Sequence, residues 1–320
     1  MSSIENEIAK ITDNLIEDYK NGRDIDNMKE VFCQPDREVI FDSLRNLMKV
    51  VYPGFYRDKN FKVYNISNEI AVLLEDIQFH LSKQVYLALR YQAAESDCSN
   101  DDLYARAEEV TLQFLRQLPK VRAYLNEDLH AAFEGDPAAF SLAEIIIAYP
   151  GLFAISIYRL AHELYTLGVP LIPRVMTEYA HSRTGIDIHP GATVGHHFFI
   201  DHGTGIVIGQ TTVIGNNVKI YQGVTLGALS THGGQCLRNK RRHPTIEDNV
   251  TIYSNASILG GDTVIGHDSV IGGNAFITKS VKPGTRVSVR TQEQLMADIR
   301  KQSGSLDPED ECWSTGLDKE

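Results

Sequence analysis

Cysteine is scarce in this chain, which has four in 320 residues. No two of them form a CxxC pair, and their spacing predicts neither a disulfide framework nor a zinc site. Reduced thiols are typical of proteins in a reducing compartment. We therefore expect a cytoplasmic protein without a bound metal.

Positive charge and long apolar stretches are also scarce. Lys and Arg number 31 against 42 Asp and Glu, which leaves a net charge of −11. This balance argues against a nucleic-acid partner, because neutralising phosphates requires a basic surface. No apolar run approaches the roughly 18 residues of a membrane span. The first residues lack a basic stretch followed by an apolar one, so neither a signal peptide nor a membrane partner is expected.

The second half of the sequence carries a six-residue period. Between Ile188 and Ile277, aliphatic residues recur every six positions, many of them followed by Gly, with one two-residue slip at Ile206-Val207. The series contains Val194, Ile200, Ile208, Ile214, Ile220 and Leu226 and, after a break, Leu259, Ile265, Ile271 and Ile277. A hexapeptide period is typical of a β-solenoid, in which each unit supplies a short strand and a turn. The sequence predicts a left-handed parallel β-helix.

The residues before this repeat predict helices, because their apolar positions recur at helical spacing. The expected fold class is therefore α+β, with an all-helical N-terminal domain over 1–184 and the β-helix over 185–289. Residues 290–320 are polar and predict a short helix and a flexible tail. A turn at Gly135-Asp136-Pro137 precedes one helix, and Asp136 is expected to cap that helix.

One insertion interrupts the repeat over residues 228–243. It is basic, with Arg238, Lys240, Arg241 and Arg242 close together. A solenoid tolerates such a loop on its outside, and loops on a rigid scaffold often carry function.

Two groups of residues could carry chemistry. Asp187 and His202 are fifteen residues apart, nearly one coil of three hexapeptides, which can bring them together on adjacent coils. An Asp that holds one imidazole nitrogen leaves the other free to take a proton from a hydroxyl, and Asp201 adds a second carboxylate. At the end of the insertion, Arg242 offers a planar fork for a carboxylate, and His243 could donate to an oxyanion. The alternatives are an exposed histidine and a solvated basic loop.

Several short motifs occur in an order that resembles serine O-acetyltransferases. They are Asp136–Ala138, Asp187–Pro190, Asp201–Gly205, Gln222–Gly227 and Arg242–Pro244. The resemblance implies acetyl transfer from acetyl-coenzyme A to L-serine, giving O-acetyl-L-serine for cysteine biosynthesis. It implies no permanently bound cofactor, because acetyl-coenzyme A is a co-substrate, and no metal.

The resemblance also assigns roles to residues. It makes His202 the general base and Asp187 its partner, places the serine amine on Asp136 and Asp201, gives the carboxylate to Arg242, and gives substrate or intermediate binding to His243. Positions that match the family's coenzyme contacts are Gly227, Ser254 and Gly273. It further implies L-cysteine as a feedback inhibitor and a homotrimer or dimer of trimers.

Three features depart from the family pattern, and one is the segment Gly284–Arg290, which stands where the family usually has Gly-Val-Pro-Ala-Arg. The segment before Arg242 is longer and more basic than in many members. The chain ends in Glu320 rather than the family's terminal isoleucine. Burying a terminal Glu would require desolvation without hydrophobic gain, so no tight complex with cysteine synthase is expected through the tail.

Three other readings remain open at this point. A γ-class carbonic anhydrase would need a third zinc ligand two coils before His197 and His202, where Ala161 and Thr166 stand. A related acetyltransferase could use another hydroxyl acceptor, such as a sugar. A non-catalytic scaffold could keep the solenoid for assembly alone.

Overall fold

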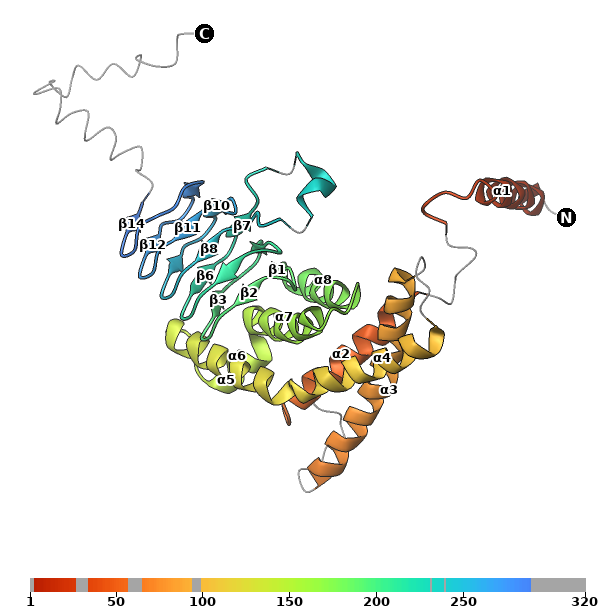
Figure 1. The fold of residues 1–320 in the computed structure, drawn as a ribbon, viewed down its shortest axis with the longest axis horizontal. Coiled ribbons are helices and arrows are strands. Elements are labelled where there is room, and N and C mark those ends of the chain that lie inside the picture. The colour runs from red at the N-terminus through yellow and green to blue at the C-terminus, as the bar shows by residue number, and fades with distance from the viewer. Residues whose placement is uncertain are drawn as a thin grey trace, which may run out of the picture. The chain divides into compact units, whose positions relative to one another are not determined.

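A computed structural model describes residues 3–26, 34–56, 65–93, 99–230, 232–238 and 240–288 (Figure 1). The helix and tail expected over 290–320 lie outside these residues. The helices before the strands are α1 (Ser3–Tyr19), α2 (Arg37–Val51), α3 (Ile66–Gln92), α4 (Asn100–Arg116), α5 (Leu118–Gly135), α6 (Leu142–Ala148), α7 (Pro150–Thr166) and α8 (Ile172–Thr184). Among the described residues, no single helix is long and apolar enough to cross a membrane, and α6 and α7, bent by 74°, reach that length and hydropathy only as a pair.

The chain divides into two compact units. The first comprises Met1–Leu118 and Glu163–Met176, and in it α2 packs on α3 and α3 on α4. The apolar face of α2 is buried at Ile40, Leu44 and Leu47. The Asp36 carboxylate accepts the Glu38 N–H at 2.8 Å and so caps the start of α2.

The second unit comprises Pro119–His162 and Thr177–Glu320, so it joins part of the helical region to the repeat. Its strands form a three-sided parallel β-solenoid of about five turns (Figure 1). The first sheet contains β1 (Asp187–Ile188), β4 (Val207–Ile208), β7 (Thr225–Gly227), β10 (Ser257–Leu259) and β13 (Phe276–Ile277). The second contains β2 (Thr193–Val194), β5 (Val213–Ile214), β8 (Thr245–Ile246) and β11 (Val264–Ile265). The third contains β3 (Phe199–Asp201), β6 (Lys219–Tyr221), β9 (Thr251–Ile252), β12 (Val270–Ile271) and β14 (Arg286–Val287).

The solenoid core follows the hexapeptide period, except that the inward residue of β10 is Ile258 and not the expected Leu259. In the first sheet Ile188 pairs with Ile208, Ile208 with Leu226 and Leu226 with Ile258, so one aliphatic side chain stacks on the next. These residues are at most 2% exposed, and burying each such side chain contributes about 1.5–3 kcal/mol. The prediction of an α+β chain with a hexapeptide β-helix is confirmed.

The turns between the sheets form the corners of the solenoid, and two of these corners carry the candidate site residues. We call the turns from the third sheet to the first sheet of the next coil the first corner, which includes residues 202–206, 253–256 and 272–275. We call the turns from the first sheet to the second the second corner, which includes residues 209–212 and the insertion 228–243. The insertion carries the short 3₁₀-helix η2 (Gly234–Leu237).

A buried ion pair joins the helices of the second unit to the first coil. The Arg159 guanidinium donates to both carboxylate oxygens of Asp128, at 2.5 and 2.8 Å, and to the Gly195 carbonyl at 2.9 Å. The Asp128 carboxylate also accepts the Phe198 N–H at 2.9 Å. The compact units therefore divide within the helical region rather than at residue 184, because these helical residues bond directly to the solenoid.

The structure corrects one expectation about Asp136. This residue does not cap the following helix, since α6 begins at Leu142 and the Ser141 hydroxyl accepts the Glu144 N–H at its start. The Asp136 carboxylate instead accepts the Ala138 N–H at 2.9 Å within its own turn. Ser141 is the nearer cap, and Asp136 therefore belongs to the turn before it.

Candidate active site

His202 lies in a turn that is longer than its neighbours. Ile188 pairs with Ile208, twenty residues on, whereas Ile208 pairs with Leu226 after eighteen. The two extra residues fall in the first corner, where His202 has a φ of 58° and Gly203 a φ of 85°. This left-handed backbone suits glycine and lets the turn protrude. The His202 side chain is 71% exposed, so the turn presents an imidazole outward.

The His202 turn stacks on the residues just before Asp187. The Gly205 N–H donates to the Gly185 carbonyl at 2.8 Å. A Cβ on Gly203 would lie 2.5 Å from the Cδ1 atom of Ile186, so this position has no room for a side chain. These contacts bring the His202 turn and Asp187 onto adjacent coils, as the spacing predicts. The Asp187–His202 pair itself stays a prediction.

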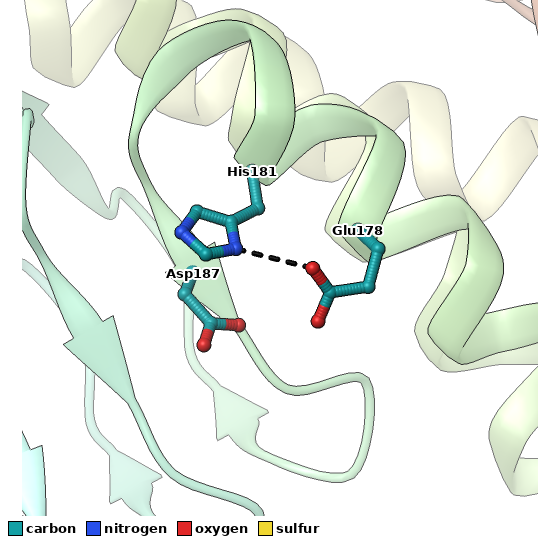
Figure 2. Close-up of side chains that lie close together, drawn as sticks. All are labelled: Glu178, His181 and Asp187. Atoms are coloured by element: carbon teal, nitrogen blue, oxygen red, sulfur yellow. Dashed lines mark hydrogen bonds and ion pairs between the residues drawn. The ribbon is translucent and has the colours of Figure 1, made fainter.

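Other titratable groups also surround Asp187. Figure 2 shows the His181 Nδ1 atom hydrogen bonded to the Glu178 carboxylate, at 3.1 Å, with the Asp187 carboxylate beside the ring. Ligand atoms of these three residues lie within 4.8 Å of one another, which makes them the one set that could hold a metal ion in the described part of the chain. A hydrogen-bonded pair one turn apart on α8 also accounts for Glu178 and His181 without a metal.

Two further carboxylates gather near His202. Asp201 immediately precedes it, with 3.6 Å between the Asp201 Oδ1 and His202 Nδ1 atoms. The Tyr149 hydroxyl donates to the Asp136 Oδ2 atom at 2.6 Å. This bond and the Ala138 N–H lower the pKa of Asp136, to which the Lys219 ammonium and the nearby His202 side chain also contribute. The same bond raises the pKa of Tyr149 to about 12. Asp136 is thereby kept ionised.

Lys219 bridges the Asp136 turn and the third sheet. Its Nζ atom donates to the Gly135 carbonyl at 2.5 Å and lies 3.7 Å from the Asp201 Oδ2 atom. The ammonium also sits 4.8 Å from the ring centroids of both Phe199 and Tyr221. A Cβ on Gly135 would lie 2.7 Å from the Phe199 ring, so the chain can approach the sheet this closely only at a glycine.

His243 is fixed as a neutral donor on the second corner. It is 7% exposed, and its Nδ1 atom accepts the Thr211 N–H at 3.0 Å. Burial, aided by the charge of Arg242, lowers the pKa of His243 to about 4. Because a backbone N–H can only donate, the proton of the neutral ring resides on Nε2. That Nε2–H group is available to an oxyanion or a substrate oxygen.

The Arg242 side chain closes the insertion. Its guanidinium donates to the Gln210 side-chain oxygen at 2.7 Å and to the Leu237 and Lys240 carbonyls at 3.3 Å each. The Thr211 hydroxyl accepts the Arg242 N–H at 2.9 Å, which anchors the end of the insertion to the preceding coil. Gln210 and Thr211 thus position both residues of the Arg-His motif.

The expected coenzyme residues divide between the same two corners. Ser254 and Gly273 stack on the first corner, where a Cβ on Gly273 would lie 3.1 Å from the Ser254 carbonyl oxygen. Gly227 ends β7 and borders the second corner, paired with Leu259. The structure therefore collects Asp136, Asp187, Asp201, His202, Ser254 and Gly273 on one side and Gly227, Arg242 and His243 on another.

Sequence reasoning missed Tyr149, Lys219, Gln210 and Thr211. Tyr149 precedes a Pro-Gly turn signal and carries no motif. For Lys219 a signal exists: it lies one coil above Phe199 on the outward face of the repeat, in register with it. An outward Lys with one aromatic residue in register on the adjacent strand and another two positions on in its own strand is therefore a sequence signal for a cation held against rings.

A hexapeptide solenoid with an exposed imidazole, flanking carboxylates and a neutral histidine donor defines an acyltransferase of the hexapeptide-repeat class. No family model matches the chain. It is 42% identical over 279 residues to a plasmid-encoded serine acetyltransferase of Synechococcus elongatus, covering 85% of this chain and 86% of that one. It is 48% identical over 128 residues to the Bacillus subtilis serine acetyltransferase, covering 40% of this chain and 56% of the relative.

Solved structures agree with the sequence matches. Serine acetyltransferase 1 of Entamoeba histolytica, solved with L-cysteine, superposes with a TM-score of 0.65 at 34% identity, covering 90% of this chain and all of that one. The Neisseria gonorrhoeae enzyme, solved with serine, gives a TM-score of 0.51 at 28% identity over 78% of this chain and 96% of the other. This chain belongs to the serine acetyltransferase family.

Proposed function

We propose that the chain transfers the acetyl group of acetyl-coenzyme A to the hydroxyl of L-serine, with His202 as the general base. The observation that carries this assignment is the imidazole of His202 beside the carboxylates of Asp136 and Asp201. An amino acid needs an anion for its ammonium, a cation for its carboxylate and a base for its weakly acidic hydroxyl. Asp136, Asp201, Arg242 and His202 supply these groups.

The reaction follows from this arrangement. His202 removes the serine hydroxyl proton as the oxygen attacks the thioester carbonyl carbon. The resulting oxyanion accepts a hydrogen bond from the His243 Nε2–H group. When the tetrahedral intermediate collapses, the carbon–sulfur bond breaks and the coenzyme thiolate takes the proton from the His202 imidazolium. Asp187 orients the imidazole and stabilises its charge.

We propose a homotrimer in which each active site lies between two subunits. His202 and His243 belong to different corners, with the first sheet between them. A second copy can bring its second corner to the first corner of its neighbour, and three copies close this head-to-tail contact into a ring. A dimer of such trimers is compatible with the same site.

Co-expression of two inactive variants tests the shared site. His202→Ala and His243→Ala subunits each lack one residue, and a mixed ring contains some sites with both histidines intact. Random mixing at equal amounts should restore about one quarter of the sites. Mixtures no more active than either variant alone would contradict a shared site.

Acetyl-coenzyme A is proposed to lie along the groove between Gly227 of one subunit and Ser254 and Gly273 of the next. These coenzyme residues divide between the second corner and the first corner, as the serine-binding residues do. This common division supports one continuous site. The basic insertion is a candidate contact for the coenzyme phosphates or for the neighbouring subunit. A cytoplasmic location is part of the same proposal, since the few cysteines are expected to be reduced.

L-Cysteine is proposed as a competitive inhibitor, because it offers the same ammonium and carboxylate as serine. The E. histolytica structure with bound L-cysteine supports this reading. A thiol-release assay with a panel of acceptors tests the substrate: L-serine should be acetylated well, and homoserine and a galactoside poorly. Preference for a sugar would instead support the related acetyltransferase that uses another hydroxyl acceptor.

A further inference from the structure

The two carboxylates assigned to the serine amine create an electrostatic problem. Asp136 and Asp201 are both acidic, whereas serine brings a single ammonium. Like charges close together raise the pKa of one another and repel when both are ionised. An additional positive charge is needed to leave one net negative charge for one ammonium. Lys219 supplies this positive charge, because its ammonium lies 3.7 Å from the Asp201 carboxylate.

The contacts of Lys219 reach both sides of this carboxylate pair. Its ammonium lies 3.7 Å from Asp201 and donates to the carbonyl of Gly135, the residue before Asp136. The Lys219 and Asp201 side chains are only 22% and 13% exposed, so their attraction is less screened than at an open surface. Lys219 also lowers the pKa of Asp136, although less than the Tyr149 hydrogen bond does.

The aromatic rings fix the direction of the Lys219 side chain. Phe199 and Tyr221 both lie 4.8 Å from the ammonium, and Tyr221 stacks on Tyr253 with 5.0 Å between ring centroids. A cation held between two rings loses little further freedom when it also binds Asp201 and Gly135. The arrangement is therefore prepared before substrate arrives.

We propose that Lys219 is a positioning residue for the serine amine: it sets the separation of Asp136 and Asp201 and cancels one of their two negative charges. The proposal rests on the proposed function, because it takes the serine ammonium to lie between these carboxylates. Lys219 acts through both of them and takes no part in proton transfer. Its loss should therefore weaken serine binding and leave the chemical step nearly intact.

Three substitutions separate the contributions of Lys219. Lys219→Met keeps the aliphatic length beside Phe199 and removes both charge and donor. Lys219→Gln keeps a donor for the Gly135 carbonyl without the charge, and Lys219→Arg keeps both. Lys279→Met is the matched control, because Lys279 is an exposed lysine on a later coil.

The measurements are KM for serine, KM for acetyl-coenzyme A, kcat and the cysteine inhibition constant. For Lys219→Met we expect KM for serine and the cysteine constant to rise together by about tenfold, with kcat and the KM for acetyl-coenzyme A within about threefold of wild type. Lys219→Gln should fall between Met and wild type, and Lys219→Arg should recover most of the serine affinity. The Lys279 control should match wild type throughout.

Some outcomes would overturn the proposal. An unchanged KM for serine in Lys219→Met would do so, as would a fall in kcat with both KM values unchanged. If Lys219→Met does not fold, Lys219→Gln decides on the same criteria. Failure of the wild-type enzyme to acetylate serine would instead reject the proposed function, so the two failures are distinguishable.

Discussion

Replacing Gly209 by Ala puts a methyl group into the space of the His243 imidazole. A Cβ at this position would lie 2.1 Å from the His243 Cδ2 atom and 2.2 Å from its Nε2 atom. Contacts this short are not sustained, so one group must move. The ring has little freedom, since it is buried and held through Nδ1 by Thr211. We expect the Nε2–H group to leave its position.

The size of the effect follows from the role assigned to His243. Removing one oxyanion donor typically lowers kcat by about 10²–10³. Gly209→Ala should therefore approach the loss measured for His243→Ala, in steady-state assays that follow thiol release with acetyl-coenzyme A and L-serine. Circular dichroism would establish that the variant keeps its solenoid.

A double substitution makes the prediction sharper. Removing the imidazole opens the space that the new methyl group needs, so Gly209→Ala should have little further effect in a His243→Ala background. Such strong non-additivity is expected for groups in direct contact. Independent, multiplicative losses would refute the reasoning, as would wild-type turnover in the Gly209→Ala single variant.

Two further predictions concern stability and pH. Arg159→Ala leaves the Asp128 carboxylate buried without its partner, so it should lower the free energy of unfolding by about 3–5 kcal/mol in chemical denaturation. Arg116→Ala breaks an exposed pair and should change the free energy of unfolding by less than about 1 kcal/mol. Equal effects of the two substitutions would be inconsistent with a buried pair. Tyr149→Phe removes the main cause of the lowered pKa of Asp136, so this pKa should rise toward its usual value. The loss of serine binding on acidification should then begin at a higher pH, which the pH profile of kcat/KM for serine measures. An unshifted profile would argue against this role of Asp136.

The solenoid could be predicted because its signal is local and repeated. Most inward aliphatic residues, such as Ile214 and Ile220, follow the previous one by six positions, and the slip at Ile206-Val207 coincides with the turn that presents His202. The slip is a two-residue lengthening of the first corner. His202 itself was predicted from its fifteen-residue separation from Asp187 and from the motif Asp201–Gly205, and not from this slip.

The residues that support the site through hydrogen bonds and ion pairs could not be predicted. Their partners are distant in sequence, and the contacts depend on packing. Lys219 meets Gly135 across 84 positions, and Arg159 meets Asp128 across 31. The expectation that Asp136 caps a helix was wrong because a second capping residue, Ser141, stands closer to the helix start. Local rules placed Asp136 in a turn but could not supply its Tyr149 partner.

The assignment of His202 as the base is tested most directly by turnover with L-serine. His202→Ala should lower kcat by about 10²–10⁴ in the thiol-release assay, with the fold intact. His197→Ala is the matched control, since His197 is another exposed histidine with left-handed backbone, on the same coil, and it should keep wild-type turnover. Near-wild-type acetylation of L-serine by the His202→Ala variant would contradict the account.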